Sequence, residues 1–121
     1  ALIDTMQSLD CPVITVGEGV VASMAAVILA CGDHRQVYRH TQVLIHQLMG
    51  GTGMAQQTDI EIVAQHTAAM RAELDELLAE HGNLSAQEFH ELTERDCWCN
   101  ARRALELGLV DEVIAPSKKA L

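Results

Sequence analysis

Residues 11–32 read CPVITVGEGVVASMAAVILACG, in which a β-branched run, a glycine turn and an apolar run follow one another directly. The run over 11–17 has the composition of a short strand. Gly17 and Gly19 mark the turn, and the small and aliphatic residues over 22–31 predict a helix. A strand, a tight turn and a helix in this order indicate an α/β fold.

The rest of the chain alternates strands and helices in the same way. A capping-box sequence opens at Ser85, and alternating apolar residues mark a strand before residue 47. The expected elements are a helix over 1–9, strands over 11–17, 41–47 and 109–114, helices over 22–31, 55–81, 85–92 and 101–108, a polar loop at 33–36 and a frayed tail over 115–121. This order predicts one α/β domain, or part of one, built on crossover units.

Composition and charge exclude several classes of protein. The 121 residues are 49% hydrophobic and 2% aromatic, so the core must be largely aliphatic. A formal net charge of -9 gives no electrostatic basis for binding nucleic acid, which needs clustered Lys and Arg. No apolar run approaches the ~20 residues that span a bilayer, and no signal-peptide pattern is present. We therefore expect a cytoplasmic protein that does not contact membranes.

The four cysteines have neither the spacing of a disulfide framework nor that of a zinc site. Cys97 and Cys99 are separated by one residue, which is closer than the usual two-residue zinc knuckle, and no second pair accompanies them. We expect no metal site and four free, mostly buried thiols at Cys11, Cys31, Cys97 and Cys99.

The predicted helix over 55–81 carries a stripe of mostly apolar residues at intervals of three and four. The stripe consists of Ile60, Val63, Thr67, Met70, Leu74, Leu77 and His81. Such a helix is longer than most helices of globular domains. The pattern leaves two arrangements open, because the helix can project toward a partner or lie across the core of its own domain.

Ser23 lies between the glycine turn and the apolar helix, where two interpretations compete. A serine hydroxyl is an effective nucleophile only when a base accepts its proton and a carboxylate orients that base. The local sequence lacks the G-x-S-x-G pattern of α/β-hydrolases and by itself favours a small residue that begins a helix. Among six histidines, only His46 ends an apolar strand before a glycine-rich break. Asp96 is distinctive among the carboxylates because it joins a charged segment to an apolar one.

Four stretches of the chain together resemble the Clp protease proteolytic subunit family (ClpP). They are ASMAAVILACG (22–32), VLIHQLMGG (43–51), AELDELLAEHG (72–82), and TERDCW followed by ARRALELGLVDEVI (93–98 and 101–114). The resemblance covers almost the whole chain, and its motifs occur in the family's order. It implies a ClpP/crotonase-like α/β fold of repeated β-β-α units, in which the long helix is a projecting handle.

The resemblance also implies roles for individual residues. The family's nucleophile corresponds to Ser23, its general base to His46 and its acid to Asp96. The backbone N–H of Met24 would donate to the oxyanion. Arg95, beside the acid, would couple ring contacts to the active site.

A ClpP-like chain would be a serine endopeptidase subunit that cleaves unfolded polypeptides inside an oligomeric barrel. The resemblance implies two stacked heptameric rings that interdigitate through the handle helix. The helix contacts would come from Ile60, Val63, Met70, Leu74 and Leu77. Hexameric AAA+ unfoldases would feed the chamber and use the ATP, so we expect no cofactor in this subunit.

The chain departs from the family pattern at Val20, Ala25 and Leu48, where a polar residue, a glycine and a proline are usual. The family's S-P-G-G oxyanion segment precedes the first helix, so we expect this sequence to be a fragment whose first strands lie upstream. These departures leave open a catalytically inactive structural subunit of a mixed ring. A signal-peptide peptidase or acyl-CoA hydratase of the crotonase-like fold is less favoured, because no lysine precedes Lys118.

Overall fold

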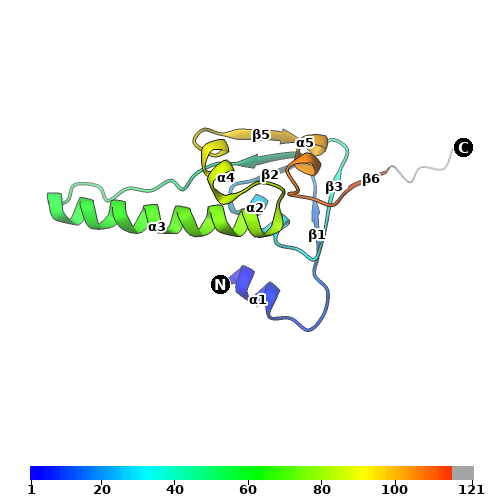
Figure 1. The fold of residues 1–121 in the computed structure, drawn as a ribbon, viewed down its shortest axis with the longest axis horizontal. Helices are drawn as coiled ribbons and strands as arrows, with labels where there is room; N and C mark the ends of the chain where they lie inside the picture. Colours follow the sequence, from blue (N-terminus) through cyan, green and yellow to red (C-terminus); the bar gives the residue numbers. More distant parts are fainter. Residues whose placement is uncertain (116–121) are drawn as a thin grey trace, which may run out of the picture.

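Two small sheets and one long helix form the architecture of the chain (Figure 1). The computed structural model describes residues 1–115, so the tail predicted to continue from there lies outside the described residues. The elements are α1 (Leu2–Gln7), β1 (Ile14–Gly17), β2 (Val20–Ala22), α2 (Met24–Ala30), β3 (His34–Tyr38), β4 (Gln42–Ile45), α3 (Gln57–His81), α4 (Ala86–Leu92), β5 (Cys97–Asn100), α5 (Ala101–Glu106) and β6 (Glu112–Ile114).

Two β-β-α units repeat along the chain. In the first, β1 and β2 precede α2, and in the second, β3 and β4 precede α3. The first strands of the two units, β1 and β3, pair in parallel, and so do the second strands, β2 and β4. The resulting sheets have the orders β1-β3-β6 and β2-β4-β5, in which β6 is parallel to β3 and β5 is antiparallel to β4. The predicted α/β fold of repeated β-β-α units is therefore confirmed.

Three strands are not predicted by the sequence pattern. β2 occupies part of the expected turn, β3 begins in the expected polar loop at 33–36, and β5 lies where no strand is expected. β3 is polar because one of its two buried side chains, Arg35, is buried in polar interactions rather than in apolar contacts. The strands expected over 11–17 and 109–114 are also shorter, beginning at Ile14 and Glu112.

Helix α2 fills the core between strands of both sheets. It contacts β1 and β3 of one sheet and β2 and β4 of the other sheet. Its buried residues are Ala26, Val27, Leu29 and Ala30. A Cβ atom on Gly17 would lie 3.0 Å from Val37 Cγ1 and 3.2 Å from Leu29 Cδ2. The glycine in β1 therefore allows the close approach of α2 that holds Ser23 at the start of this helix.

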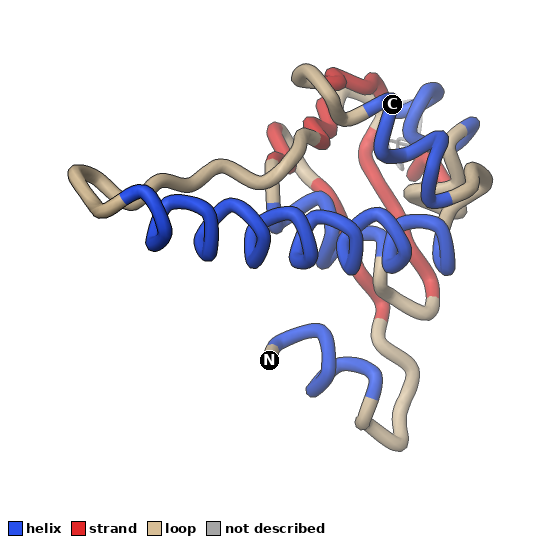
Figure 2. The backbone as a smooth tube through the Cα atoms, turned by 60° about the vertical axis from the view of Figure 1, so that its left-hand side comes forward, coloured by secondary structure: helices blue, strands red, loops and turns tan. Residues whose placement is uncertain are grey.

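Helix α3 combines the two arrangements that the sequence leaves open. Its N-terminal half and the segment 46–56 that leads into it extend beyond the sheets (Figures 1 and 2). Toward its C-terminal end, Leu78 is buried, and Leu74 and Leu77 are partly buried against the core. No helix within residues 1–115 is long and apolar enough to cross a membrane.

The five predicted interface residues of α3 differ in exposure. The resemblance implies that Leu74 and Leu77 contact another subunit, and in this chain both side chains are partly buried against the core of their own domain. Ile60, Val63 and Met70 remain exposed on the rest of the helix. The exposed apolar side chains of the predicted interface therefore lie toward the N-terminal end of α3.

Arg35 joins the ends of several elements. Its Nη1 donates to the carbonyls of Ala30 (3.1 Å), His81 (2.8 Å) and Gly108 (2.7 Å), and its Nε and Nη2 donate to the Asp111 carboxylate (3.0 and 2.6 Å). These hydrogen bonds hold the pKa of Asp111 below its usual range. One buried guanidinium thus connects the ends of α2 and α3 to the segment that enters β6.

The capping box predicted at Ser85 is confirmed, and α5 is also capped at both ends. Ser85 Oγ accepts from the Glu88 N–H at 3.1 Å, and the Ser85 N–H donates to Glu88 Oε2 at 2.8 Å. This capping box lowers the pKa of Glu88. Asn100 Oδ1 accepts from the Arg103 N–H at 2.9 Å and begins α5. Gly108 follows α5 with a φ of 71°, the left-handed conformation common after helix ends.

Candidate active site

Ser23 occupies a strained turn between β2 and α2. Its φ of 60° and ψ of −129° make it the one non-glycine residue with a positive φ among residues 1–115. Such backbone conformations cost about 1–3 kcal/mol and are found where the surrounding structure imposes them. Ser23 is exposed, and its side chain makes no capping hydrogen bond to α2. The Ser23 hydroxyl therefore does not act as a helix cap.

The pairing of β2 with β4 brings Ser23 beside His46. The last residue of β2, Ala22, pairs with Leu44, and the Ser23 N–H donates to the Leu44 carbonyl at 3.0 Å. His46 directly follows the last residue of β4, Ile45. Ser23 and His46 line a common cavity of about 320 Å³.

The pairing of β4 with β5 brings Asp96 to the same edge of the sheet. These strands are antiparallel, and Ile45 pairs with Cys97. His46 follows this pair on one strand, and Asp96 precedes it on the other. His46 and Asp96 line a second cavity of about 510 Å³. His46 therefore borders both cavities, the one with Ser23 and the one with Asp96.

The imidazole of His46 is held by the backbone of the next residue. His46 Nδ1 lies 2.6 Å from the Gln47 carbonyl oxygen. Because a carbonyl only accepts, Nδ1 is the donor in this hydrogen bond. Within the described residues, no hydrogen bond joins His46 to Ser23 or to Asp96. Ser23, His46 and Asp96 therefore lie at the same edge of the sheet β2-β4-β5, but no hydrogen bond joins them within the described residues.

Two further predicted residues, Met24 and Arg95, flank this edge. Met24 is the first residue of α2, and it lines the cavity of Ser23. Arg95 is exposed, and its guanidinium donates to the Glu94 carbonyl at 3.0 Å. Arg95 also lines the cavity that His46 and Asp96 share.

Three polar residues near the site are not identified by sequence reasoning. Arg71 of α3 donates to Gln47 Oε1 at 2.9 Å and to Glu94 Oε2 at 3.1 Å. Gln47 follows His46, and Glu94 lies two residues before Asp96. The sequence feature that could have identified Arg71 is that it is the one Lys or Arg of α3.

The four cysteines are free thiols that differ in exposure. Cys31 and Cys99 are buried, Cys97 is half-buried and Cys11 is exposed. Burial raises the pKa of Cys31 to about 11 and that of Cys99 to about 12. Over residues 1–115, no three His, Cys, Asp or Glu side chains come together as they would around a metal ion.

The fold and the site define an α/β protein of repeated β-β-α units with a serine, a histidine and an aspartate at one sheet edge. The family model described as Clp protease matches residues 1–117. The chain belongs to the Clp protease family, as the sequence resemblance indicates.

Curated relatives named "ATP-dependent Clp protease proteolytic subunit" are similar along most of the chain. The protein of Streptococcus sanguinis (strain SK36) is 40% identical over 120 residues, which are 97% of this chain and 61% of the relative. That of Lactococcus lactis subsp. cremoris (strain SK11) is 38% identical over 117 residues, 94% of this chain and 59% of the relative. This chain therefore spans about three fifths of the length of these relatives.

Proposed function

We propose that this chain is part of a serine endopeptidase subunit of the Clp type that cleaves unfolded polypeptides. The observation that carries the proposal is the convergence of Ser23, His46 and Asp96 on one edge of the sheet β2-β4-β5. Family membership supports it, and so does the position of His46 in a cavity that Ser23 also lines.

In the proposed mechanism, Ser23 Oγ attacks the scissile carbonyl while His46 Nε2 accepts the hydroxyl proton. His46 then gives this proton to the leaving amine as the peptide C–N bond breaks, which leaves an acyl ester on Ser23. Water, deprotonated by His46, hydrolyses the ester and restores the serine. The Met24 N–H would donate to the oxyanion, and preorganised donors of this kind contribute about 10²–10³-fold in rate.

Asp96 would act by orienting the protonated Nδ1 of His46. In the structure this nitrogen donates to the Gln47 carbonyl, which selects the same tautomer that a carboxylate would select. A turn of the ring from the Gln47 carbonyl to Asp96 would complete the triad. Asp96 is exposed and borders the same cavity as His46, which supports this arrangement.

We propose that the subunit assembles into stacked heptameric rings through α3. Ile60, Val63 and Met70 offer an exposed apolar surface on this helix, which a second copy would cover. Arg95 would respond to ring contacts beside Asp96. An AAA+ unfoldase would supply unfolded chains and use ATP, and this subunit would need no cofactor. The cytoplasmic location stays a prediction, which cell fractionation tests.

Labelling by a fluorophosphonate probe tests the proposal in the full-length protein. The probe reacts with a serine only where a base activates it, so we expect one labelled site that Ser23→Ala abolishes. Ser8→Ala, which removes another exposed serine hydroxyl, is the matched control and should leave labelling unchanged. Labelling that persists in Ser23→Ala would contradict the assignment of the nucleophile.

A second candidate function is a catalytically inactive structural subunit of a mixed ring. It is favoured by one observation, the hydrogen bond of His46 Nδ1 to the Gln47 carbonyl instead of Asp96. This alternative predicts no probe labelling of the wild-type chain and co-purification with a second ClpP-like chain.

A further inference from the structure

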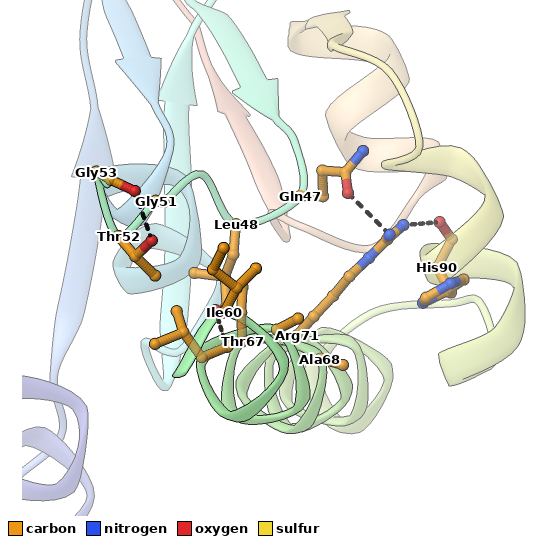
Figure 3. A pocket seen from close by; sticks show the side chains of 13 residues that line it. Gln47, Leu48, Gly51, Thr52, Gly53, Ile60, Thr67, Ala68, Arg71 and His90 are labelled. Carbon is orange, nitrogen blue, oxygen red and sulfur yellow. Dashed lines mark hydrogen bonds between the residues drawn. The ribbon is translucent and has the colours of Figure 1, made fainter. Parts of the chain in front are cut away.

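Arg71 is the centre of a hydrogen-bond network between α3 and the two segments that carry His46 and Asp96. Its Nη1 donates to Gln47 Oε1 at 2.9 Å, and its Nη2 donates to the His90 carbonyl at 3.0 Å (Figure 3). Nη2 also donates to Glu94 Oε2 at 3.1 Å. The Arg71 side chain is only 16% exposed, so these charge-assisted bonds are partly shielded from water.

Gln47 closes the network between the two segments. Its Nε2 donates to the Glu94 carbonyl at 2.9 Å, and its backbone N–H donates to the Thr93 carbonyl at 3.1 Å. Three groups of one residue, the side-chain oxygen, the side-chain nitrogen and the backbone N–H, are therefore engaged. The remaining polar group, the Gln47 carbonyl, accepts the His46 Nδ1 proton.

These contacts hold the side chain and the N–H of Gln47 against the segment that carries Asp96. His46 directly precedes Gln47, so the same contacts also hold the segment that carries His46. The Glu94 contacts act two residues before Asp96, on the segment that must present the acid to His46.

We propose that Arg71 is a positioning residue that holds the segment of His46, through Gln47, beside the segment of Asp96, through Glu94. The inference rests on the proposed function, since it assigns Arg71 to the peptidase site. Arginine suits this position because its planar fork presents separate donors to several acceptors, whereas a lysine ammonium is a single point of contact.

The test compares Arg71→Met, Arg71→Lys and Gln47→Leu in the full-length protein. Arg102→Met is the matched control, since Arg102 lies on α5 with its side chain 87% exposed. For each variant, the maximal rate of fluorophosphonate labelling and the half-saturating probe concentration are measured separately. Amide hydrogen exchange of residues 46–49 and 93–96 is measured in parallel.

We expect Arg71→Met to lower the maximal labelling rate about 10- to 100-fold, since small misplacements of catalytic groups have effects of this size. The half-saturating concentration should change less than about twofold, which a merely structural defect would not predict. Arg71→Lys should be intermediate. The double variant Arg71→Met/Gln47→Leu should be no slower than the slower single variant, because both changes break one link.

Three results would overturn the inference: an Arg71→Met rate equal to that of Arg102→Met, independent multiplying effects of Arg71→Met and Gln47→Leu, or unchanged exchange in both segments. If Arg71→Met does not fold, Arg71→Lys and Gln47→Leu make the same comparison. A wild-type protein that does not label refutes the proposed peptidase instead, and faster exchange in Arg71→Met would still identify the network that holds His46.

Discussion

At the scale of single residues, Ser23 is the most unusual position in the chain. Its backbone conformation is one that glycine adopts without strain, yet a serine occupies it. The N–H to Leu44 and the packing of α2 impose this conformation. The Ser23 hydroxyl makes no cap hydrogen bond to α2, and the residue lines the cavity shared with His46. The strain therefore lies at a position where chemistry is proposed.

Ser23→Gly should separate strain from chemistry. Both Ser23→Gly and Ser23→Ala remove the hydroxyl, but only glycine relieves the strain of a positive φ. We expect the glycine variant to be more stable than the alanine variant by about 1 kcal/mol in urea unfolding, with neither labelled by the probe. Equal unfolding midpoints for the two variants would show that the turn stores no strain.

At the scale of elements, Arg35 joins α2, α3 and the segment before β6 by hydrogen bonds and not by apolar contacts. The guanidinium satisfies carbonyls at the ends of helices that would otherwise be buried without partners. The Asp111 carboxylate neutralises its charge. The strand β3 therefore depends on an ion pair with a residue far away in the sequence.

Acid titration should reveal the contribution of Asp111. Hydrogen bonds from Arg35 depress the folded-state pKa of this carboxyl, so its stabilisation is present above the unfolded pKa of about 3.9. The stabilisation is lost as the pH falls through the lower, folded-state pKa. Asp111→Asn should lower the free energy of unfolding by about 1 kcal/mol at pH 7, a value reduced for the partial exposure of the carboxylate.

Unfolding followed from pH 7 to pH 2 provides the measurement. Below about pH 4, the free energy of unfolding of Asp111→Asn should fall less steeply with decreasing pH than that of the wild type. Asp10→Asn, an exposed carboxylate in the loop after α1, is the control and should keep the wild-type slope. Parallel pH curves for Asp111→Asn and the wild type would rule out this role of the ion pair.

At the scale of the whole molecule, α3 is both part of the core and a projection from it. Its last turns pack against the core of the domain. Its first turns expose apolar side chains that the chain itself does not cover. Apolar side chains gathered on a projecting element are typical of contact surfaces between subunits. The same helix carries Arg71, so an interface on α3 would act on an element that also contacts the site.

Ile60→Asp should therefore weaken the proposed stacking of rings, because a charge would be buried in an apolar contact. Sedimentation velocity is expected to give a particle about half the wild-type mass, as two rings separate. Gln65→Asp adds the same charge at an exposed polar position of α3 and should leave the assembly intact. An unchanged particle in Ile60→Asp would exclude this part of α3 from the interface.

Much of the fold could be predicted from the sequence because its signals are local. The periodic stripe located α3, and the capping box at Ser85 located the start of α4. β3 was missed because Arg35 looks like a loop residue until its partners are known. Arg71 was missed for the same reason, since its acceptors lie in segments distant from α3 in the sequence.

By itself, the sequence determined the order of most elements, the α/β class and the family, because periodicity, caps and motifs depend on residues that are near one another in the chain. It also singled out Ser23, His46 and Asp96 as candidates. Only the tertiary structure decided that these three meet at one sheet edge, that His46 donates to Gln47 instead of Asp96, and that Arg71 joins their segments. Strand register and buried polar contacts join residues far apart in sequence, and no local pattern encodes which of them meet.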